Sequence, residues 1–262
     1  MRTWLRIFLI GGLMSFRALF AWINPWVYIP TLIVTPVFQI VFFAYLGRTA
    51  HLKSDGWFVI GNAVQVASFA ALFGMGFAID GERWQQTLSP LLATPANRTA
   101  IFLGRALPVL ANAAFVSAAS FGAAGLLLGY HPPLASVPAL ALIVLLGAFS
   151  CTGLGMVTGS VALRIRDMPI MANLVMAGLL IFCGTNVPLD ALPGWMSTIA
   201  QGLPLTHAIA AARQVADGAS LGSVDALVRK EIALGLGYLA IGFVLLRFFE
   251  FEGRRHATLD RL

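Results

Sequence analysis

Charge is what this sequence has least of. Only 11% of its 262 residues are charged, whereas 59% are hydrophobic. Soluble domains carry about 25% charged residues, so the composition predicts an integral membrane protein. The net charge of +6 agrees with basic residues gathered at the cytoplasmic ends of membrane spans. No nucleic-acid partner is therefore predicted.

Lysine and cysteine are also scarce, and both shortages exclude kinds of site. A P-loop needs a lysine preceded by glycine and followed by serine or threonine. Neither of the two lysines, Lys53 and Lys230, has that context, so the chain is predicted to hold no nucleotide through this motif. Cys151 and Cys183 lie in apolar stretches and are predicted to be buried, reduced side chains. No HExxH, GxSxG or zinc-ligand spacing occurs, and no catalytic residue or metal is predicted.

Long runs without charge predict six membrane-spanning helices in one all-α domain covering residues 1–262. A span needs about 20 apolar residues, and two successive prolines in GYHPPLAS (129–136) divide the longest run, because proline cannot continue a helix. The predicted spans cover about residues 25–46, 56–79, 103–128, 135–163, 169–187 and 232–249. Their centres hold no ionisable residue of the kind that ion-coupled transporters use as relays. Any transport is thus predicted to draw its energy from another polypeptide.

The distribution of arginine and lysine predicts how these spans are oriented. Six crossings place both ends of the sequence on one side, together with the loop at 80–100. Twelve of the 17 basic residues fall on that side and five on the other. Because cytoplasmic segments carry the excess of basic residues, both termini are predicted to be cytoplasmic.

The stretch before the first span, residues 1–24, is predicted to be an amphipathic helix. On a helical wheel Arg2, Arg6 and Arg17 lie within about 60° of one another, and aromatic residues accompany them. Such a helix lies on the membrane surface. The alternative is a positively charged leader that merely flanks the first span.

The segment between the last two spans, residues 188–228, is predicted to form short external helices. It is too apolar for a solvated loop, and Pro188, Pro193 and Pro204 interrupt it. Short hydrophobic pieces of this kind are re-entrant or interfacial, and irregular backbone at membrane depth must be buried in protein or line a cavity. This segment is expected to cap the external end of the bundle. In the sequence it lies after spans three to five (101–187) and before span six with its tail (229–262).

Two glycine pairs have the GxxxG spacing that lets helices approach closely. They are Gly125 with Gly129 and Gly155 with Gly159. Packing between helices of this chain is the favoured interpretation, and a seam between two copies is the alternative.

The cytoplasmic stretch DGERWQQTLSPLLATPANR (80–98) is predicted to contain a short helix over about 81–93. Leu88, Leu91 and Leu92 fall at positions i, i+3 and i+4, which places them on one apolar face. An amphipathic helix of this kind docks into a groove on a partner. The alternative is an interfacial turn that rests on lipid headgroups.

This stretch follows spans one and two (residues 25–79). Its sequence resembles a signature of a known family. ERWQQTLSPLLATP is similar to the ERxxGTLExLLxTP signature that follows the second span of ABC-2 permeases, the membrane subunits of type-2 ABC exporters. PLDALPGWMSTIAQGLPLTHAIAAAR (188–213) is similar to the P…LPxW…PLT…R segment before the last span of that family. Gln86 stands where the family has glycine, and Ser89 stands where it has an acid.

The resemblance implies a transporter of two permease chains and two ABC ATP-binding subunits in a bacterial plasma membrane. ATP and Mg²⁺ would be bound by the partner subunits, with no cofactor in this chain and with membrane lipids around it. The second permease would be another copy of this chain or a sister permease. The 80–100 segment would be the coupling helix that contacts the ATPase through Glu82, Arg83, Thr87, Leu88, Leu91, Leu92, Thr94 and Pro95.

Family analogy also implies that the first, second and fifth spans line the transport pathway. The candidate lining residues are Phe38, Phe42, Phe43, Asn62, Gln65 and Phe69. A phenylalanine-rich, uncharged lining suits a hydrophobic or amphipathic cargo. A drug or antibiotic is favoured by the similarity to small drug-resistance permeases, with a lipid-linked saccharide as the alternative. There are two simpler interpretations. The aromatic side chains would face lipid, and the amides would form hydrogen bonds between helices.

Two further classes of protein remain as alternatives. One is a channel or scaffold that needs no nucleotide. The other is a membrane enzyme, which requires ionisable residues clustered at one membrane face. The nearest cluster is Arg164, Arg166 and Asp167, and it is more simply the charged end of a span.

Overall fold

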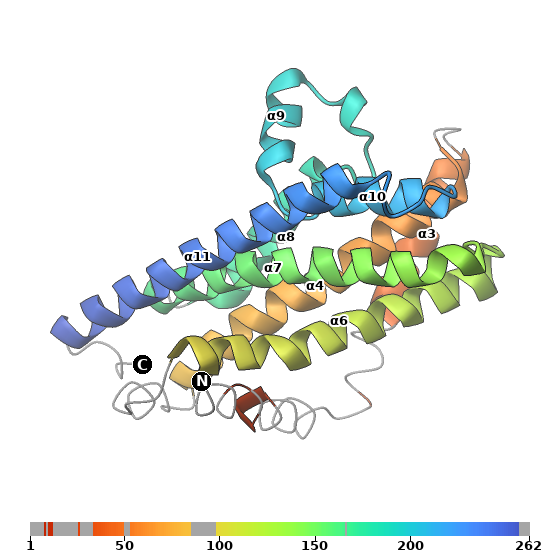
Figure 1. Cartoon of the computed structure of the whole chain (residues 1–262). Coiled ribbons are helices and arrows are strands. Elements are labelled where there is room, and N and C mark those ends of the chain that lie inside the picture. The colour runs from red at the N-terminus through yellow and green to blue at the C-terminus, as the bar shows by residue number, and fades with distance from the viewer. Residues whose placement is uncertain are drawn as a thin grey trace.

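The computed structural model describes residues 8, 10–12, 26, 34–49, 53–84, 98–165 and 167–256 (Figure 1). The regular structure in these residues is helical throughout, as the composition predicts. The helices are α3 (Thr35–Thr49), α4 (Asp55–Trp84), α6 (Arg98–Leu128), η2 (Leu134–Ser136), α7 (Val137–Ile165), α8 (Met168–Phe182), η3 (Leu189–Ala191), α9 (Gly194–Gly202), α10 (Thr206–Ala216) and α11 (Asp225–His256).

Four of the described helices are long and apolar enough to cross a membrane. Their apolar segments are Asp55–Gly81, Leu103–Leu128, Leu134–Ile165 and Asp225–Phe249. These coincide with the predicted second, third, fourth and sixth spans. The break at the two prolines of the 129–136 turn is also confirmed, since α6 ends before them and α7 begins after them.

The predicted first and fifth spans correspond to shorter helices. α3 and α8 have 15 residues each, which gives about 22 Å at 1.5 Å per residue, against about 30 Å of hydrocarbon. For the first span, residues 27–33 lie outside the described part of the chain. The predicted end of the fifth span, at 187, is wrong because the chain leaves the helix after Phe182 and turns at Gly184, where φ is 74°.

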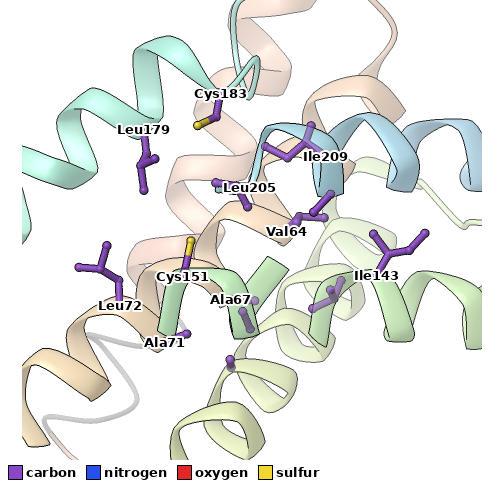
Figure 2. Packing of buried hydrophobic residues seen from close by; sticks show 14 of the residues in the cluster. Val64, Ala67, Ala71, Leu72, Ile143, Cys151, Leu179, Cys183, Leu205 and Ile209 are labelled. Carbon is purple, nitrogen blue, oxygen red and sulfur yellow. The ribbon is translucent and has the colours of Figure 1, made fainter. Parts of the chain in front are cut away.

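Helix α4 forms the centre of the bundle. Of its most apolar window, 83% is buried, against 17% for the corresponding window of α11. It contacts α3, α6, α7, α8 and α10. Figure 2 shows the same arrangement, with Leu72 of α4 near Cys151 of α7 and Leu179 of α8, and with Val64 of α4 near Ile209 of α10. Both cysteines are buried and free, as predicted.

The Gly155–Gly159 pair packs α7 directly on α4. A Cβ added to Gly155 would lie 2.5 Å from the carbonyl oxygen of Leu72, and one added to Gly159 would lie 3.1 Å from the Cα of Gly76. The two backbones therefore approach so closely that any side chain at Gly155 would overlap them. This confirms the favoured interpretation, helix packing within the chain.

The corresponding prediction for Gly125 and Gly129 is wrong. Gly129 follows the end of α6 and has a positive φ of 68°. A Cβ on Gly125 would meet the ring of His131 in the same turn, at 3.3 Å. Gly125, near the end of α6, faces the turn that Gly129 begins, so their spacing does not mark a seam between two helices.

Residues 188–213 fold into short helices separated by prolines, as the sequence predicts. Pro188 precedes η3, Pro193 precedes α9, and Pro204 lies just before α10. In Figure 1, α9 stands away from the long helices, whereas α10 lies across them at the end where α11 begins. Eight of the 11 residues of α10 are buried, so this helix is part of the core.

The predicted amphipathic helix at 1–24 is described only at residues 8 and 10–12, which are helical. There the chain lies against the start of α6. A Cβ on Gly104 would be 2.7 Å from the carbonyl oxygen of Phe8, and one on Gly12 would be 2.9 Å from that of Gly104. The rest of this prediction falls outside the described residues.

Candidate functional site

The predicted coupling helix lies mostly outside the described residues. α4 continues to Trp84, so Glu82 and Arg83 belong to the last turn of α4 rather than to the start of a separate helix. Nothing in the sequence stops the helix there, because the first proline of this stretch is Pro90. Thr87, Leu88, Leu91, Leu92, Thr94 and Pro95 fall in the undescribed stretch 85–97, and their role stays a prediction.

The six candidate pathway residues divide into an exposed aromatic set and a buried polar pair. Phe38 and Phe42 of α3 are 70% and 62% exposed, and Phe43 meets the Phe42 ring edge-on at 5.3 Å. Phe69 of α4 is partly exposed and stacks on Phe73 at 4.4 Å between centroids. Asn62 and Gln65, by contrast, are buried. The structure thus places only the aromatic residues where they face outward.

A chain of amides connects the buried pair to two further residues. Gln39 of α3 donates from Nε2 to Asn62 Oδ1 at 3.0 Å and to Gln65 Oε1 at 3.2 Å. Asn62 in turn donates from Nδ2 to Asn186 Oδ1 at 2.8 Å. These four side chains join α3, α4 and the turn after α8. Gln39 is half-buried and follows the exposed Phe38 in α3.

Arg213 of α10 holds the backbone beside this amide chain. It donates from Nε to Trp57 O at 3.2 Å, from one terminal nitrogen to Gly184 O at 2.8 Å and from the other to Thr185 O at 2.8 Å. Its guanidinium also lies 3.5 Å from the centroid of the Trp57 ring, a cation–π contact. Burial lowers the pKa of Arg213 to about 9, so the group remains protonated at neutral pH.

Gly61 makes the approach of Arg213 possible. A Cβ at that position would lie 2.5 Å from a terminal nitrogen of Arg213 and 2.8 Å from Thr185 O. Glycine thus leaves room for the turn at 184–185 to pass directly over α4. Because this turn carries the carbonyls that Arg213 binds, α8 ends earlier than the lack of charge in 183–187 suggests.

Glu231 of α11 is a buried carboxylate at the other end of α10. It accepts the backbone N–H of Leu205 at Oε1 (2.7 Å) and that of Ala208 at Oε2 (3.1 Å). The hydroxyl of Ser150 on α7 also donates to Oε1. α10 has no capping side chain of its own, so the carboxylate of another helix satisfies its first N–H groups, as helix starts require. A negative charge is also favourable at a helix N-terminus.

The sixth span begins earlier in the structure than predicted, and its first turns carry charged residues. The span was expected to begin at Ile232, but α11 begins at Asp225 and its apolar segment includes Glu231. The first two turns of α11 are amphipathic, with Arg229 and Lys230 exposed and Glu231 fully buried. A helical wheel through 225–231 is the signal that finds this residue.

Arg164 and Asp167, which raised the alternative of a membrane enzyme, have structural roles. Arg164 pairs with Glu252 of α11. Asp167 accepts the N–H of Ile170 at 3.0 Å and caps α8. Arg166 lies outside the described residues. These contacts are those of a charged helix end.

Comparison with known families agrees with this architecture. The family model described as ABC-2 type transporter matches residues 11–216, which is most of the chain. The chain belongs to the ABC-2 type transporter family. A search of curated proteins found no matching sequence. Within this ABC-2 chain, the matched region runs from the N-terminal helix to the end of α10 and includes both motifs that carry the resemblance. Glu231 lies beyond it.

The residues that sequence reasoning missed in the ABC-2 chain are Gln39, Asn186, Arg213 and Glu231. Arg213 has a sequence signal, because it is the arginine that ends the PLT…R motif. Gln39 and Asn186 are single amides in apolar surroundings, which sequence alone does not pair. Their contacts come from segments between 23 and 124 residues apart.

Replacing Arg213 with lysine is expected to destabilise the ABC-2 chain. One ammonium does not reproduce the planar fork that bonds three carbonyls, and each charge-assisted hydrogen bond lost costs about 1.5–3 kcal/mol. Thermal unfolding in detergent, followed by tryptophan fluorescence, measures the effect. Arg229→Lys is the matched control, because Arg229 is exposed and pairs only with Asp225 at 3.0 Å. Equal unfolding temperatures for the two variants would contradict the assigned role of Arg213.

Proposed function

We propose that this chain is the permease subunit of an ATP-driven exporter in a bacterial plasma membrane. It would cross the membrane six times, with both termini in the cytoplasm. The observation that carries the proposal is the family match over residues 11–216. Four apolar helices of spanning length and the excess of basic residues on one predicted side support it.

Membership of the ABC-2 family implies a separate ABC ATP-binding partner. We propose two copies of that subunit, each binding ATP and Mg²⁺, together with a second copy of the permease. The leucine face of residues 88–92 would be the docking surface, because it presents apolar side chains at helical spacing. The permease itself would then contribute movement and a pathway, and the partner would supply the energy.

Helix α4 is suited to transmit movement from that docking surface. It is a continuous helix of 30 residues, about 45 Å long at 1.5 Å per residue. One end, at Trp84, leads directly into the predicted coupling segment, and the amides Asn62 and Gln65 lie in its other half. Because α4 is the most buried of the four described spanning helices, a shift at Trp84 would also move α7, which packs against it through Gly155. Differential affinity of the partner for ATP in the two states would bias this movement.

The cargo proposed for this pathway is amphipathic or hydrophobic and resembles a drug or antibiotic. Phe38, Phe42 and Phe69 offer an exposed apolar surface, and Gln39 next to them offers an uncharged polar group. Sites for such molecules combine aromatic walls with a few polar groups. A lipid-linked saccharide is the second candidate cargo, since its lipid would suit the same aromatic surface.

Co-expression with the ATP-binding subunit encoded beside this chain tests the proposal. The two proteins are expected to co-purify and, in liposomes, to hydrolyse ATP faster than the ATP-binding subunit alone. Uptake of ethidium into inverted vesicles then tests the drug-like cargo, and transfer of a lipid-linked saccharide tests the alternative. If the two proteins do not co-purify, and this chain does not change the rate of ATP hydrolysis by the ATP-binding subunit, the result would favour a channel or a scaffold.

A further inference from the structure

Helix α10 is attached at both ends by charged side chains, one half-buried (Arg213) and one buried (Glu231). Glu231 of α11 holds its first turn, and Arg213 in its last turn holds α4 and the turn after α8. Ser150 adds α7 to the first attachment. A helix of 11 residues is therefore tied to four other parts of the bundle.

The first attachment holds a backbone conformation that needs support. Leu205 has a φ of 82°, in the left-handed region that L-residues rarely adopt and that costs free energy. Its N–H donates to Glu231 at 2.7 Å, and its side chain is fully buried. The preceding residue is held as well, because the thiol of Cys183 donates to Pro204 O at 3.3 Å.

Between these attachments α10 packs tightly on the neighbouring helices. Ala208 faces Gly147 of α7, where an added Cβ would lie 3.2 Å from the Ala208 Cβ. Ile209 and Ala212 are part of the main hydrophobic cluster. Separating α10 from the bundle would expose this surface and leave a carboxylate and a guanidinium without their buried partners, which is strongly unfavourable.

We propose that α10 is a fixed crosspiece: it stays attached to α4, α7 and α11 through the whole transport cycle, and Glu231 and Arg213 are its positioning residues. Elements that open during a functional cycle come from the weakly held parts of a protein, and α10 is among the most strongly held. The pathway would then open along another surface of the chain, and not between α10 and the bundle. This inference rests on the proposed function.

A cysteine pair across the α7–α10 contact tests the inference. Gly147→Cys and Ala208→Cys are combined with Cys151→Ala and Cys183→Ser, so that the new pair is the only one present. Their spacing is close to the Cβ–Cβ distance of about 3.5–4.5 Å found in disulfides. The complex with the ATP-binding subunit is oxidised without nucleotide, with ATP, and after trapping with vanadate. Each single-cysteine variant serves as the control.

If α10 is a fixed crosspiece, we expect the disulfide yields in the three states to lie within about twofold of one another. The oxidised complex is then expected to hydrolyse ATP at a rate within about twofold of the reduced complex. The proposal is overturned if the disulfide fails to form, if it forms in only one state, or if it stops hydrolysis that reductant restores. Hydrolysis by the complex before oxidation is measured first. If it is absent, the proposed function fails, while the disulfide yields still report on α10.

The native cysteines provide a second test that needs no new thiol. Cys183 lies beneath the first attachment, whereas Cys151 lies in α7, and both are buried. In Glu231→Ala, labelling of Cys183 by N-ethylmaleimide is expected to be at least about tenfold faster, with Cys151 still protected, because only the local attachment is released. Glu231→Gln is expected to fall between this variant and wild type. Glu252→Ala, at the exposed end of α11, is the control. Unchanged labelling of Cys183, or equal exposure of both thiols, would overturn the positioning role of Glu231.

Discussion

Replacing both Leu88 and Leu91 with aspartate is expected to abolish stimulation of the ATP-binding subunit while the chain still reaches the membrane. The two leucines lie three residues apart on the predicted apolar face. Each side chain, if buried in a groove of the partner, contributes about 1.5–3 kcal/mol. A carboxylate in that groove would also lose its hydration without gaining a partner. Co-purification and ATP hydrolysis in liposomes measure the loss.

Ser89→Asp is the matched control for this double variant. It adds the same charged side chain between the two leucines but off their face, since neighbouring helix positions are turned by about 100°. It also introduces the acid that the resembling family has at this position. Hydrolysis is expected to stay near the wild-type rate or above it. If the double variant docks and hydrolyses as well as Ser89→Asp does, the leucine face is not the docking surface.

Gly155→Val is expected to prevent the chain from accumulating as a folded membrane protein. A Cβ at this position would lie 2.5 Å from Leu72 O and 3.0 Å from Leu72 Cα, and both are backbone atoms of the central helix. Overpacking of a core costs about 1–3 kcal/mol when side chains can move aside, and here only a shift of α4 or α7 relieves the overlap. Helix association in membranes depends on such close packing. The amount of protein extracted in mild detergent as a single chromatographic peak measures the effect.

Gly237→Val is the control for the valine itself. Gly237 lies on α11 and is exposed, and a Cβ added there would meet no atom within 4 Å. Any general effect of a β-branched residue in a helix is therefore present in this variant, while the overlap is not. Wild-type amounts of both variants would show that α4 and α7 do not depend on the close contact at Gly155.

Much of the helical framework followed from the sequence because apolar runs of spanning length have few alternative structures. The second, third, fourth and sixth predicted spans agree with the apolar segments of described helices to within about two residues, except at the start of the sixth. The fifth was predicted too long, because its last residues carry no charge but form a turn, whose Gly184 and Thr185 carbonyls Arg213 binds. Leu205 also lies outside a regular helix although its side chain is buried in the core, because its backbone has a positive φ.

The candidate functional residues likewise fall into those that local motifs indicate and those that only tertiary contacts reveal. Motif and spacing pointed to Leu88, Leu91 and Leu92, and to Asn62 and Gln65 as polar groups in apolar helices. They did not indicate that Gln39 bridges the two amides or that Asn186 extends them. Those contacts depend on how helices cross, and a helix offers several faces on which a single amide would look the same in sequence.

The sequence by itself determined that this is an all-helical membrane protein of the ABC-2 type, because composition and local motifs depend on neighbouring residues alone. Only the tertiary structure decided that α4 is the central helix, that α10 belongs to the core, and that the half-buried Arg213 and the buried Glu231 hold its two ends. The physical reason is that burial of a charge requires partners brought together by folding. The N–H groups that donate to Glu231 belong to residues 26 and 23 positions away in the sequence, and no local sequence pattern predicts these contacts.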